Sequence, residues 1–323
     1  MAIVAGIDEA GYGPVLGPLV VSAVAFKIPD EQADASLWKL LRGTVTKKPS
    51  RRPASLAIGD SKQLYSGLRA KRGLADLERG VLAMLRTGGR SPATLGELLA
   101  VVAPQAADRA ADYPWYAAQE LPLPHSVGPT DLSLISNALS VAMRRVGLSL
   151  EMIRCEVLFE GEFNRVVQVT RNKSTMLFDT TCRLLDELWR RYAARGLCIH
   201  ADHQGGRINY LPGLQRAFDG CRFKVIDQTP TRSAYQMADG ERRAEVRFAV
   251  GAERVHLAAA LASMVSKYVR ELLMAVFNRF WAQQVPGVAP TAGYYTDGKR
   301  FYGDILQAVR RLGIDKQMLY RTR

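Results

Sequence analysis

Four acidic residues stand at the ends of apolar segments, where their carboxylates could act together on one metal centre. Asp8 and Glu9 follow the apolar run 3–7 and precede a glycine-rich turn, in the stretch IVAGIDEAGYGP. Asp202 ends the apolar stretch LCIHAD, and Glu253 follows RFAVGA. Ligands made only of oxygen select hard ions such as Mg²⁺ or Mn²⁺. Two such ions can activate a water molecule and stabilise the leaving oxygen of a phosphodiester.

Each acid taken alone also has a plainer interpretation. A pair such as Asp8 and Glu9 before a glycine is typical of an Asx-type turn with solvated carboxylates. Adjacent residues of a strand point to opposite faces, so a straight strand cannot direct both side chains at one ion. Gly11 and Gly13 permit the backbone to bend there. Because three strand ends each finish in a carboxylate, the pattern as a whole favours a shared metal site.

The balance of charge points to a polyanionic partner. Lys and Arg total 44 against 31 acids, which gives a net charge of +13. Such an excess favours nucleic acid ahead of an anionic membrane, because basic side chains release the counterions of the phosphates. No apolar run reaches the roughly 18 residues of a membrane span, and the N-terminus lacks the basic segment of a signal peptide. We therefore expect no membrane association.

The cysteine pattern indicates a reducing compartment. The four cysteines, Cys155, Cys182, Cys198 and Cys221, have no CxxC spacing and are too few for a disulfide framework. They are interpreted as buried thiols of a cytoplasmic protein.

Hydrophobic periodicity predicts strands followed by alternating helices and strands, which indicates an α/β fold with a mixed sheet. Residues 31–53 and 88–130 are expected as a polar loop and a surface insertion. The predicted strands cover 3–8, 18–27, 152–160, 197–202 and two or three segments within 221–253; the predicted helices cover 66–86, 131–148, 172–196, 256–284 and 301–313.

Five segments together resemble the type 2 ribonuclease H family. GIDEAGYGPVLGPLVV resembles the opening motif of ribonuclease HII, which reads GIDEAGRGP, and GDSKQL at 59–64 resembles the DSKxL motif. AMRRVGL resembles the helix that precedes the third acid of the family. GAERVHLAAALASMVSKYVRELLM resembles the helix AAASIIAKVTRDRLM with the acid upstream of it, and AGYYTDGKRF resembles GYxT. The segments follow the order of the family and span most of the chain.

The resemblance implies a ribonuclease H-like fold, with a mixed five-stranded sheet flanked by helices. It implies one catalytic domain over residues 1–323. Surface insertions are expected at about 88–130 and 221–250, and a C-terminal helical extension at about 285–323.

The resemblance also implies a catalytic site of four carboxylates that binds Mg²⁺ or Mn²⁺ through Asp8, Glu9, Asp202 and Glu253. Glu253 stands where type HII has aspartate, and the sister type HIII has glutamate. Asp227 and Asp239 remain alternatives for the third ligand, because the interval from Asp202 to Glu253 is longer than in typical HII.

Substrate contacts follow from the same motifs. The turn Gly11–Tyr12–Gly13 would lie against the sugar-phosphate backbone, near the ribose 2′-OH that distinguishes RNA from DNA. Tyr12 stands where type HII has arginine; it could stack on a base or sugar but supplies no guanidinium, so recognition of a single ribonucleotide in DNA stays open. The other implied substrate contacts are phosphate contacts by Ser61, Lys62 and Lys267 and stacking on a sugar by Tyr294.

The leading hypothesis is a monomeric, metal-dependent endoribonuclease that cuts the RNA strand of RNA–DNA hybrids and leaves 5′-phosphate and 3′-hydroxyl ends. One alternative is a nuclease of the same fold with another nucleic-acid substrate. A second is a nucleic-acid-binding protein that has lost catalysis, against which the retention of four acids argues.

Overall fold

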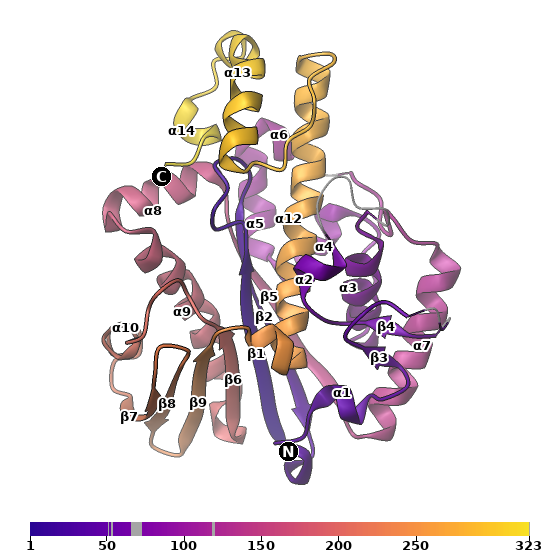
Figure 1. Cartoon of the computed structure of the whole chain (residues 1–323), viewed down its shortest axis with the longest axis vertical. Coiled ribbons are helices and arrows are strands. Elements are labelled where there is room, and N and C mark those ends of the chain that lie inside the picture. The colour runs from indigo at the N-terminus through magenta and orange to yellow at the C-terminus, as the bar shows by residue number, and fades with distance from the viewer. Residues whose placement is uncertain (51, 53, 66–72, 118–119, 323) are drawn as a thin grey trace.

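A mixed β-sheet forms the centre of the molecule (Figure 1). The computed structural model describes all residues except 51, 53, 66–72, 118–119 and 323. Within the described residues the sheet has seven strands in the order β5–β2–β1–β6–β9–β8–β7. The strands are β1 Ala2–Ala10, β2 Leu19–Ile28, β5 Ser149–Leu158, β6 Leu197–Asp202, β7 Arg222–Gln228, β8 Arg232–Asp239 and β9 Arg242–Ala249, with a separate short pair, β3 Val45–Thr46 and β4 Leu56–Ala57.

Helices cover both faces of this sheet. One face carries the long helix α12 with α3 and α7, and the other carries α9 and α10. The helices are α1 Leu37–Leu40, α2 Ser61–Leu64, α3 Ala75–Thr87, α4 Leu95–Val102, α5 Pro104–Arg109, α6 Pro114–Ala117, α7 Pro129–Arg145, α8 Glu160–Thr170, α9 Lys173–Tyr192, α10 Leu211–Ala217, α11 Ala252–Val255, α12 Leu257–Gln284, α13 Tyr295–Arg311 and α14 Lys316–Leu319, with 3₁₀ turns at Asp30–Gln32, Ala110–Asp112 and Ala193–Arg195.

The expected α/β class with a mixed sheet is confirmed, whereas the number of strands differs from the expected five. β1 pairs antiparallel with β2, and β2 with β5, while β1, β6 and β9 run parallel to one another. β8 and β7 then continue the sheet by antiparallel pairing beyond β9. The region 221–250, expected as an insertion at the surface, thus forms one end of the sheet. Whether it is an insertion relative to other proteins stays a prediction.

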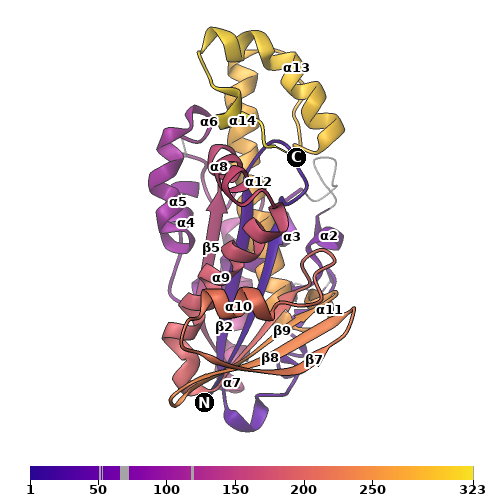
Figure 2. The ribbon, with the colours of Figure 1, turned by 90° about the vertical axis from the view of Figure 1, so that its left-hand side faces the viewer.

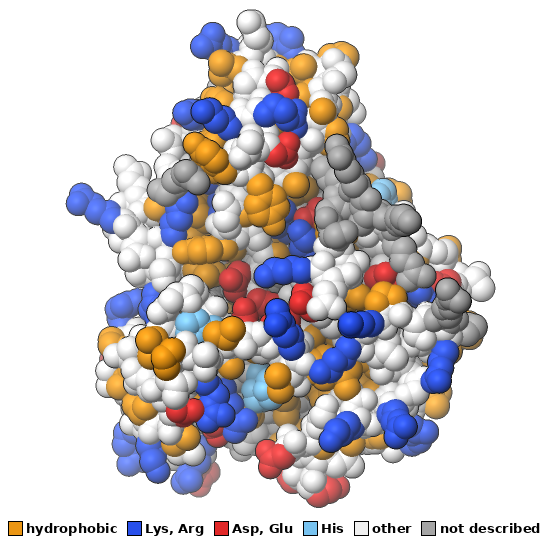
Figure 3. Space-filling view, in the orientation of Figure 1, with side chains coloured by type: hydrophobic (Ala, Val, Ile, Leu, Met, Phe, Trp, Pro, Cys, Tyr) orange, Lys and Arg blue, Asp and Glu red, His pale blue; other side chains and the backbone are white. Residues whose placement is uncertain are grey.

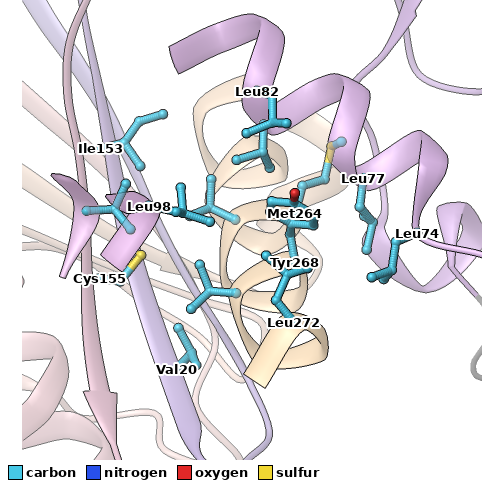
Figure 4. Close-up of a cluster of buried hydrophobic side chains, with 14 of the residues drawn as sticks. Val20, Leu74, Leu77, Leu82, Leu98, Ile153, Cys155, Met264, Tyr268 and Leu272 are labelled. Atoms are coloured by element: carbon cyan, nitrogen blue, oxygen red, sulfur yellow. The ribbon is translucent and has the colours of Figure 1, made fainter. Parts of the chain in front are cut away.

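The side-chain alternation of β1 separates two hydrophobic cores. Val4 packs in the core on the α12 side, and Ile3, Ala5 and Ile7 pack in the core on the α9 side. Both sides are apolar because a strand covered on two faces must bury every residue. In Figure 4, Met264, Tyr268 and Leu272 of α12 lie between the sheet and the leucines of α3.

The small residues of α12 allow it to lie directly on β1. A Cβ atom added to Gly6 would stand 2.1 Å from the backbone nitrogen of Ala259 and 2.5 Å from the carbonyl oxygen of Ala258. Ser266 Oγ donates to the carbonyl oxygen of Asp8 at 2.9 Å and lies 2.7 Å from Ser22 Oγ. The helix backbone therefore lies in direct contact with the backbone of β1.

The remaining expectations agree with the structure at most positions. The predicted strands and helices each coincide with an observed element, and the first part of the predicted helix 66–86 (66–72) lies outside the described residues. Two expectations were wrong in part. Residues 31–53, expected as a polar loop, contain α1 and β3 and contribute Leu37 and Trp38 to the core. The region 88–130, expected at the surface, contains α4, α5 and α6 and contributes Leu98, Trp115 and Tyr116 to the core. The C-terminal helices α13 and α14 lie at one end of the molecule, beside α12 and α8 (Figure 2). Among the described residues, no helix is both long and apolar enough to cross a membrane.

Candidate metal and nucleic-acid site

The carboxyl ends of the three parallel strands meet at one edge of the sheet. Ile7 of β1 is paired with Ala201 of β6, and Asp202 of β6 is paired with Ala249 of β9. The residues that follow in each strand or loop therefore arrive side by side, as expected for neighbouring parallel strands. This register brings together Asp8 and Glu9 from β1, Asp202 from β6, and Glu253 from α11.

The two acids of β1 lie in an environment that favours their protonated forms. Asp8 is 7% exposed, and burial, followed by the charges of Glu9 and Asp202, raises the pKa of its carboxyl well above the usual range. For Glu9, burial and then the charge of Asp202 raise the pKa to about 7, while Lys62 opposes the shift. A carboxylate at such a position gains most from a cation that replaces the lost water.

The other two acids are held by the start of α11. Asp202 Oδ1 accepts hydrogen bonds from the backbone N–H groups of Gly251 and Ala252, at 3.1 and 3.2 Å. Burial, followed by the charge of Asp202, raises the pKa of Glu253. Glu253 Oε2 is buried without a hydrogen-bond partner among the described residues. Such an orphaned oxygen is costly unless a cation binds it.

The donor set fits a hard divalent cation. The four side chains present only oxygen, their charges act on one another, and one buried oxygen lacks a partner. In the described part of the chain, no three His, Cys, Asp or Glu side chains already stand close enough to hold one ion together. The four acids therefore lie close enough for their charges to act on one another, but their side chains do not form a ready-made ion site.

The DSK segment lies beside this cluster. Asp60 caps α2 by accepting from the backbone N–H of Lys62 at 2.9 Å, and its charge adds to the raised pKa of Glu253. Lys62 is exposed, and its charge acts on Glu9. Ser61 is buried, and its hydroxyl lies 2.9 Å from Ser263 Oγ, which hydrogen-bonds to Asp8. Ser61 is therefore linked to Asp8 through Ser263. Its direct contact with phosphate stays a prediction.

Lys267 is held in a buried charge network on α12. Its Nζ lies 2.7 Å from Glu271 Oε1, and Arg270 Nη1 lies 3.2 Å from the same oxygen. Tyr65 donates to Glu271 Oε2 at 3.0 Å. Glu271 is 5% exposed, so these contacts are buried. With two cations and one carboxylate, the network keeps an excess positive charge. A phosphate contact by Lys267 stays a prediction.

The glycine turn is closely packed at Gly11 and open at Gly13. Gly11 has φ +87°, and an added Cβ would meet the carbonyl oxygen of Pro18 at 2.5 Å and Arg270 Nε at 2.6 Å. Gly13 is exposed, and an added Cβ there would meet nothing within 4 Å. Only glycine suits the first position, and the open space beside the second leaves room for a ligand.

Tyr12 lies between the acidic cluster and two arginines. The charge of Glu9 adds to the effect of burial in raising the pKa of Tyr12, and Arg207 and Arg321 oppose it. Arg207 stacks over Phe178, with its Cζ 4.8 Å from the ring centroid, and donates to Ser174 Oγ at 3.0 Å. A guanidinium therefore stands near the turn although the turn itself has none.

Three further predicted site residues, Tyr294, Asp227 and Asp239, differ in their exposure and in their ionic partners. Tyr294 precedes α13 and is 53% exposed, so its ring is accessible to a ligand. Asp227 forms an ion pair with Arg232 within the hairpin of β7 and β8, and Asp239 ends β8 opposite Arg242. Neither is among the charges that raise the pKa of Asp8, whereas Asp202 is. The geometry thus favours Asp202 over both alternatives as the third acid.

The histidines form a feature that the sequence did not indicate. The rings of His200 and His256 are stacked with centroids 3.4 Å apart. Burial lowers their pKa values to about 3 and about 4, so both are neutral at pH 7.

One face of the molecule combines acidic side chains with basic ones. In the space-filling view of Figure 3, acidic side chains gather in the middle of one face, and Lys and Arg side chains lie around them. A basic rim can hold a phosphate backbone over an acidic centre that binds cations.

Comparison with known proteins yields solved structures of ribonucleases. Ribonuclease HII from Archaeoglobus fulgidus, solved in a complex with PCNA, matches with 13% identity and a TM-score of 0.42 over 99% of this chain and 94% of that chain. Ribonuclease H2 from Pyrococcus horikoshii OT3 matches with 13% identity and a TM-score of 0.44, over 98% and 92%. Bst-RNase HIII in complex with Mn²⁺ matches with 15% identity and a TM-score of 0.45, over 99% and 66%.

No protein-family model and no curated protein matches the chain. These comparisons give no role to any residue of this chain, so the proposed roles of the site residues rest on the geometry of the site.

Proposed function

We propose that the protein is a metal-dependent endoribonuclease that cleaves the RNA strand of RNA–DNA hybrids. The observation that carries this proposal is the meeting of Asp8, Glu9, Asp202 and Glu253 at the carboxyl ends of three parallel strands, inside a basic face. Acids that are crowded together and partly buried in this way weaken the fold when they ionise unless they bind cations. The combination of a cation-binding centre with a basic rim suits the hydrolysis of a nucleic-acid backbone.

Each part of the site has a distinct task in this proposal. Two divalent ions held by the four carboxylates would supply an activated water and neutralise the charge that develops on the phosphate. Hydrolysis would consume one water, whose oxygen joins the phosphorus as the bond from phosphorus to the 3′ oxygen breaks and a proton passes to that oxygen. The products carry 5′-phosphate and 3′-hydroxyl ends.

The surrounding residues bind and orient the strand. In this proposal the exposed ammonium of Lys62, whose charge acts on Glu9, contacts a phosphate, and Lys267 adds positive charge from α12. The open side of Gly13 allows the backbone of the turn to approach the ribose. Tyr12 offers an aromatic face for stacking, and the exposed ring of Tyr294 does so at a second position.

The decisive experiment is cleavage of three labelled duplexes with Mg²⁺ and with Mn²⁺: an RNA–DNA hybrid, DNA with one embedded ribonucleotide, and DNA alone. We expect the hybrid to be cut, Asp8→Asn to abolish cutting, and Asp219→Asn, which changes an exposed acid in the loop after α10, to leave it intact. Cutting of DNA alone would favour a nuclease with another substrate. Tight binding without any cutting would favour a binding protein that has lost catalysis.

A further inference from the structure

The C-terminal tail inserts a buried arginine behind the glycine turn. Arg321 is 1% exposed although it is the third residue from the end of the sequence. Its guanidinium donates to the carbonyl oxygens of Gly11 at 2.6 Å, Gly17 at 3.2 Å and Tyr12 at 3.0 Å. The same group stacks over the ring of Phe163, at 3.7 Å from the centroid. One side chain thus gathers three backbone carbonyls of the turn.

The tail that carries Arg321 is itself fastened to the body of the protein. The backbone N–H of Arg321 donates to the carbonyl oxygen of Val15 at 2.8 Å. Asn164 of α8 donates to the carbonyl oxygens of Gln317 and Tyr320, both at 2.8 Å, and accepts from the N–H of Thr322 at 2.7 Å. Hydrogen bonds therefore fix the backbone before and after Arg321, which sets the position of its guanidinium.

A buried carboxylate completes the arrangement. Glu160 is fully buried, and its Oε1 accepts from the N–H of Gly17 at 3.1 Å and from the hydroxyl of Tyr116 at 3.0 Å. Its charge acts on Arg321. Arg270 reaches the turn from α12, donating to the carbonyl oxygens of Leu16 and Ala292 at 3.4 and 3.0 Å. The inner side of the turn is thus lined by charged groups that the catalytic site does not use.

The consequence for the outer side follows from peptide geometry. A trans peptide is planar, so the C=O of one residue and the N–H of the next point in opposite directions. Because Arg321 draws the carbonyls of Gly11 and Tyr12 inward, the N–H groups of Tyr12 and Gly13 are turned outward. Neither N–H has a hydrogen-bond acceptor among the described residues, and the space beside Gly13 is open.

We propose that Arg321 is a positioning residue that orients the backbone N–H groups of Tyr12 and Gly13 toward the sugar-phosphate backbone of the bound strand. This inference rests on the proposed function, since it names the tail residue that prepares the turn for that substrate. Without the guanidinium, three inward carbonyls lose their donor, and the two peptide planes can rotate. The outward donors are then no longer held in place for the substrate.

The test compares Arg321→Gln and Arg321→Lys with Arg310→Gln, a matched control that removes one charge from an exposed position on α13. Thermal unfolding first confirms that each variant is folded, and Arg321→Lys carries the test if Arg321→Gln does not fold. For hybrid cleavage we expect Arg321→Gln to raise KM about tenfold while kcat changes less than about threefold. Such a shift corresponds to losing one or two well-made hydrogen bonds to the substrate. Arg321→Lys should recover part of the loss, because an ammonium can still donate to some of the carbonyls.

A second readout separates this inference from the proposed function. The affinity for a fluorescent hybrid is measured without divalent metal, and Arg321→Gln should weaken it at least fivefold relative to Arg310→Gln. If the wild-type protein binds the hybrid but cuts nothing, the proposed reaction fails and this binding difference still decides the role of Arg321. A folded Arg321 variant with unchanged KM and affinity would overturn the inference, as would equal losses in Arg310→Gln or a wild type that does not bind.

Discussion

At the scale of single residues, Lys62 is the predicted phosphate contact with the clearest support. It is exposed, and its charge acts on Glu9 within the acidic cluster. Lys62→Gln should weaken binding of the hybrid several-fold, and the slope of log affinity against log salt concentration should become shallower by about one. Binding is measured by fluorescence anisotropy across a salt series. Lys39→Gln, which alters an exposed lysine on α1, should leave the slope unchanged; equal slopes in wild type and Lys62→Gln would contradict the assignment.

The buried side chain of Glu160 should make the free energy of unfolding depend on pH. Burial raises the pKa of Glu160 to about 7, from an ordinary value of 4.5. The folded protein therefore holds this proton more tightly than the unfolded chain, and the free energy of unfolding falls as pH rises from about 4.5 to 7. Glu160→Gln keeps an acceptor for Gly17 and Tyr116 but removes the charge. Relative to wild type, the variant should gain about 2–3 kcal/mol between pH 4.5 and 8.

The measurement is urea unfolding of wild type and Glu160→Gln at several pH values. Because other groups titrate in both proteins, only the difference between their free energies of unfolding is compared. A difference that does not change with pH would show that Glu160 ionises in the folded protein as easily as in the unfolded chain.

At the scale of secondary structure, the contact between β1 and α12 positions the catalytic edge of the sheet. Gly6→Ala would place a methyl group 2.1 Å from the backbone nitrogen of Ala259, which cannot move without displacing the helix. We expect a loss of about 3 kcal/mol or more in the free energy of unfolding. Gly303→Ala on α13, where an added Cβ meets nothing within 4 Å, should instead gain about 0.5–1 kcal/mol. Denaturant midpoints measure both, and a neutral Gly6→Ala would refute the close contact.

The same elements show what the sequence can and cannot predict. β1, β6 and α12 were predicted because apolar runs and periodicity are local signals, and so were the acids at the strand ends. Strands were predicted within 221–253, but the extension of the sheet by β8 and β7 beyond β9 was not, because strand pairing depends on contacts distant in the chain. The pairing of Lys267 with Glu271 was also missed. Arg321 carried no signal that set it apart from the other 43 basic residues, since its importance comes from where the tail packs.

At the scale of the whole molecule, the acidic cluster joins segments that are distant in the chain. Asp8 and Glu253 are separated by most of the sequence, yet Asp202 raises the pKa of both. The repulsion among these carboxylates opposes folding, so the fold itself is under strain at this edge of the sheet. A cation bound there would attach β1, β6 and α11 to one another and remove that repulsion. Metal binding should therefore appear in the stability of the entire chain, independently of catalysis.

We accordingly predict that 10 mM Mg²⁺ raises the melting temperature by about 2–4 °C over EDTA at matched ionic strength. A dissociation constant near 1 mM corresponds to about 1.4 kcal/mol of stabilisation. Asp202→Asn keeps an oxygen that can accept from the N–H groups of Gly251 and Ala252 but removes the charge. The variant should be at least as stable as wild type in EDTA and should lose most of the response to Mg²⁺, whereas Asp219→Asn should respond as wild type does. If Asp202→Asn and wild type shift equally, the stabilising ion binds elsewhere.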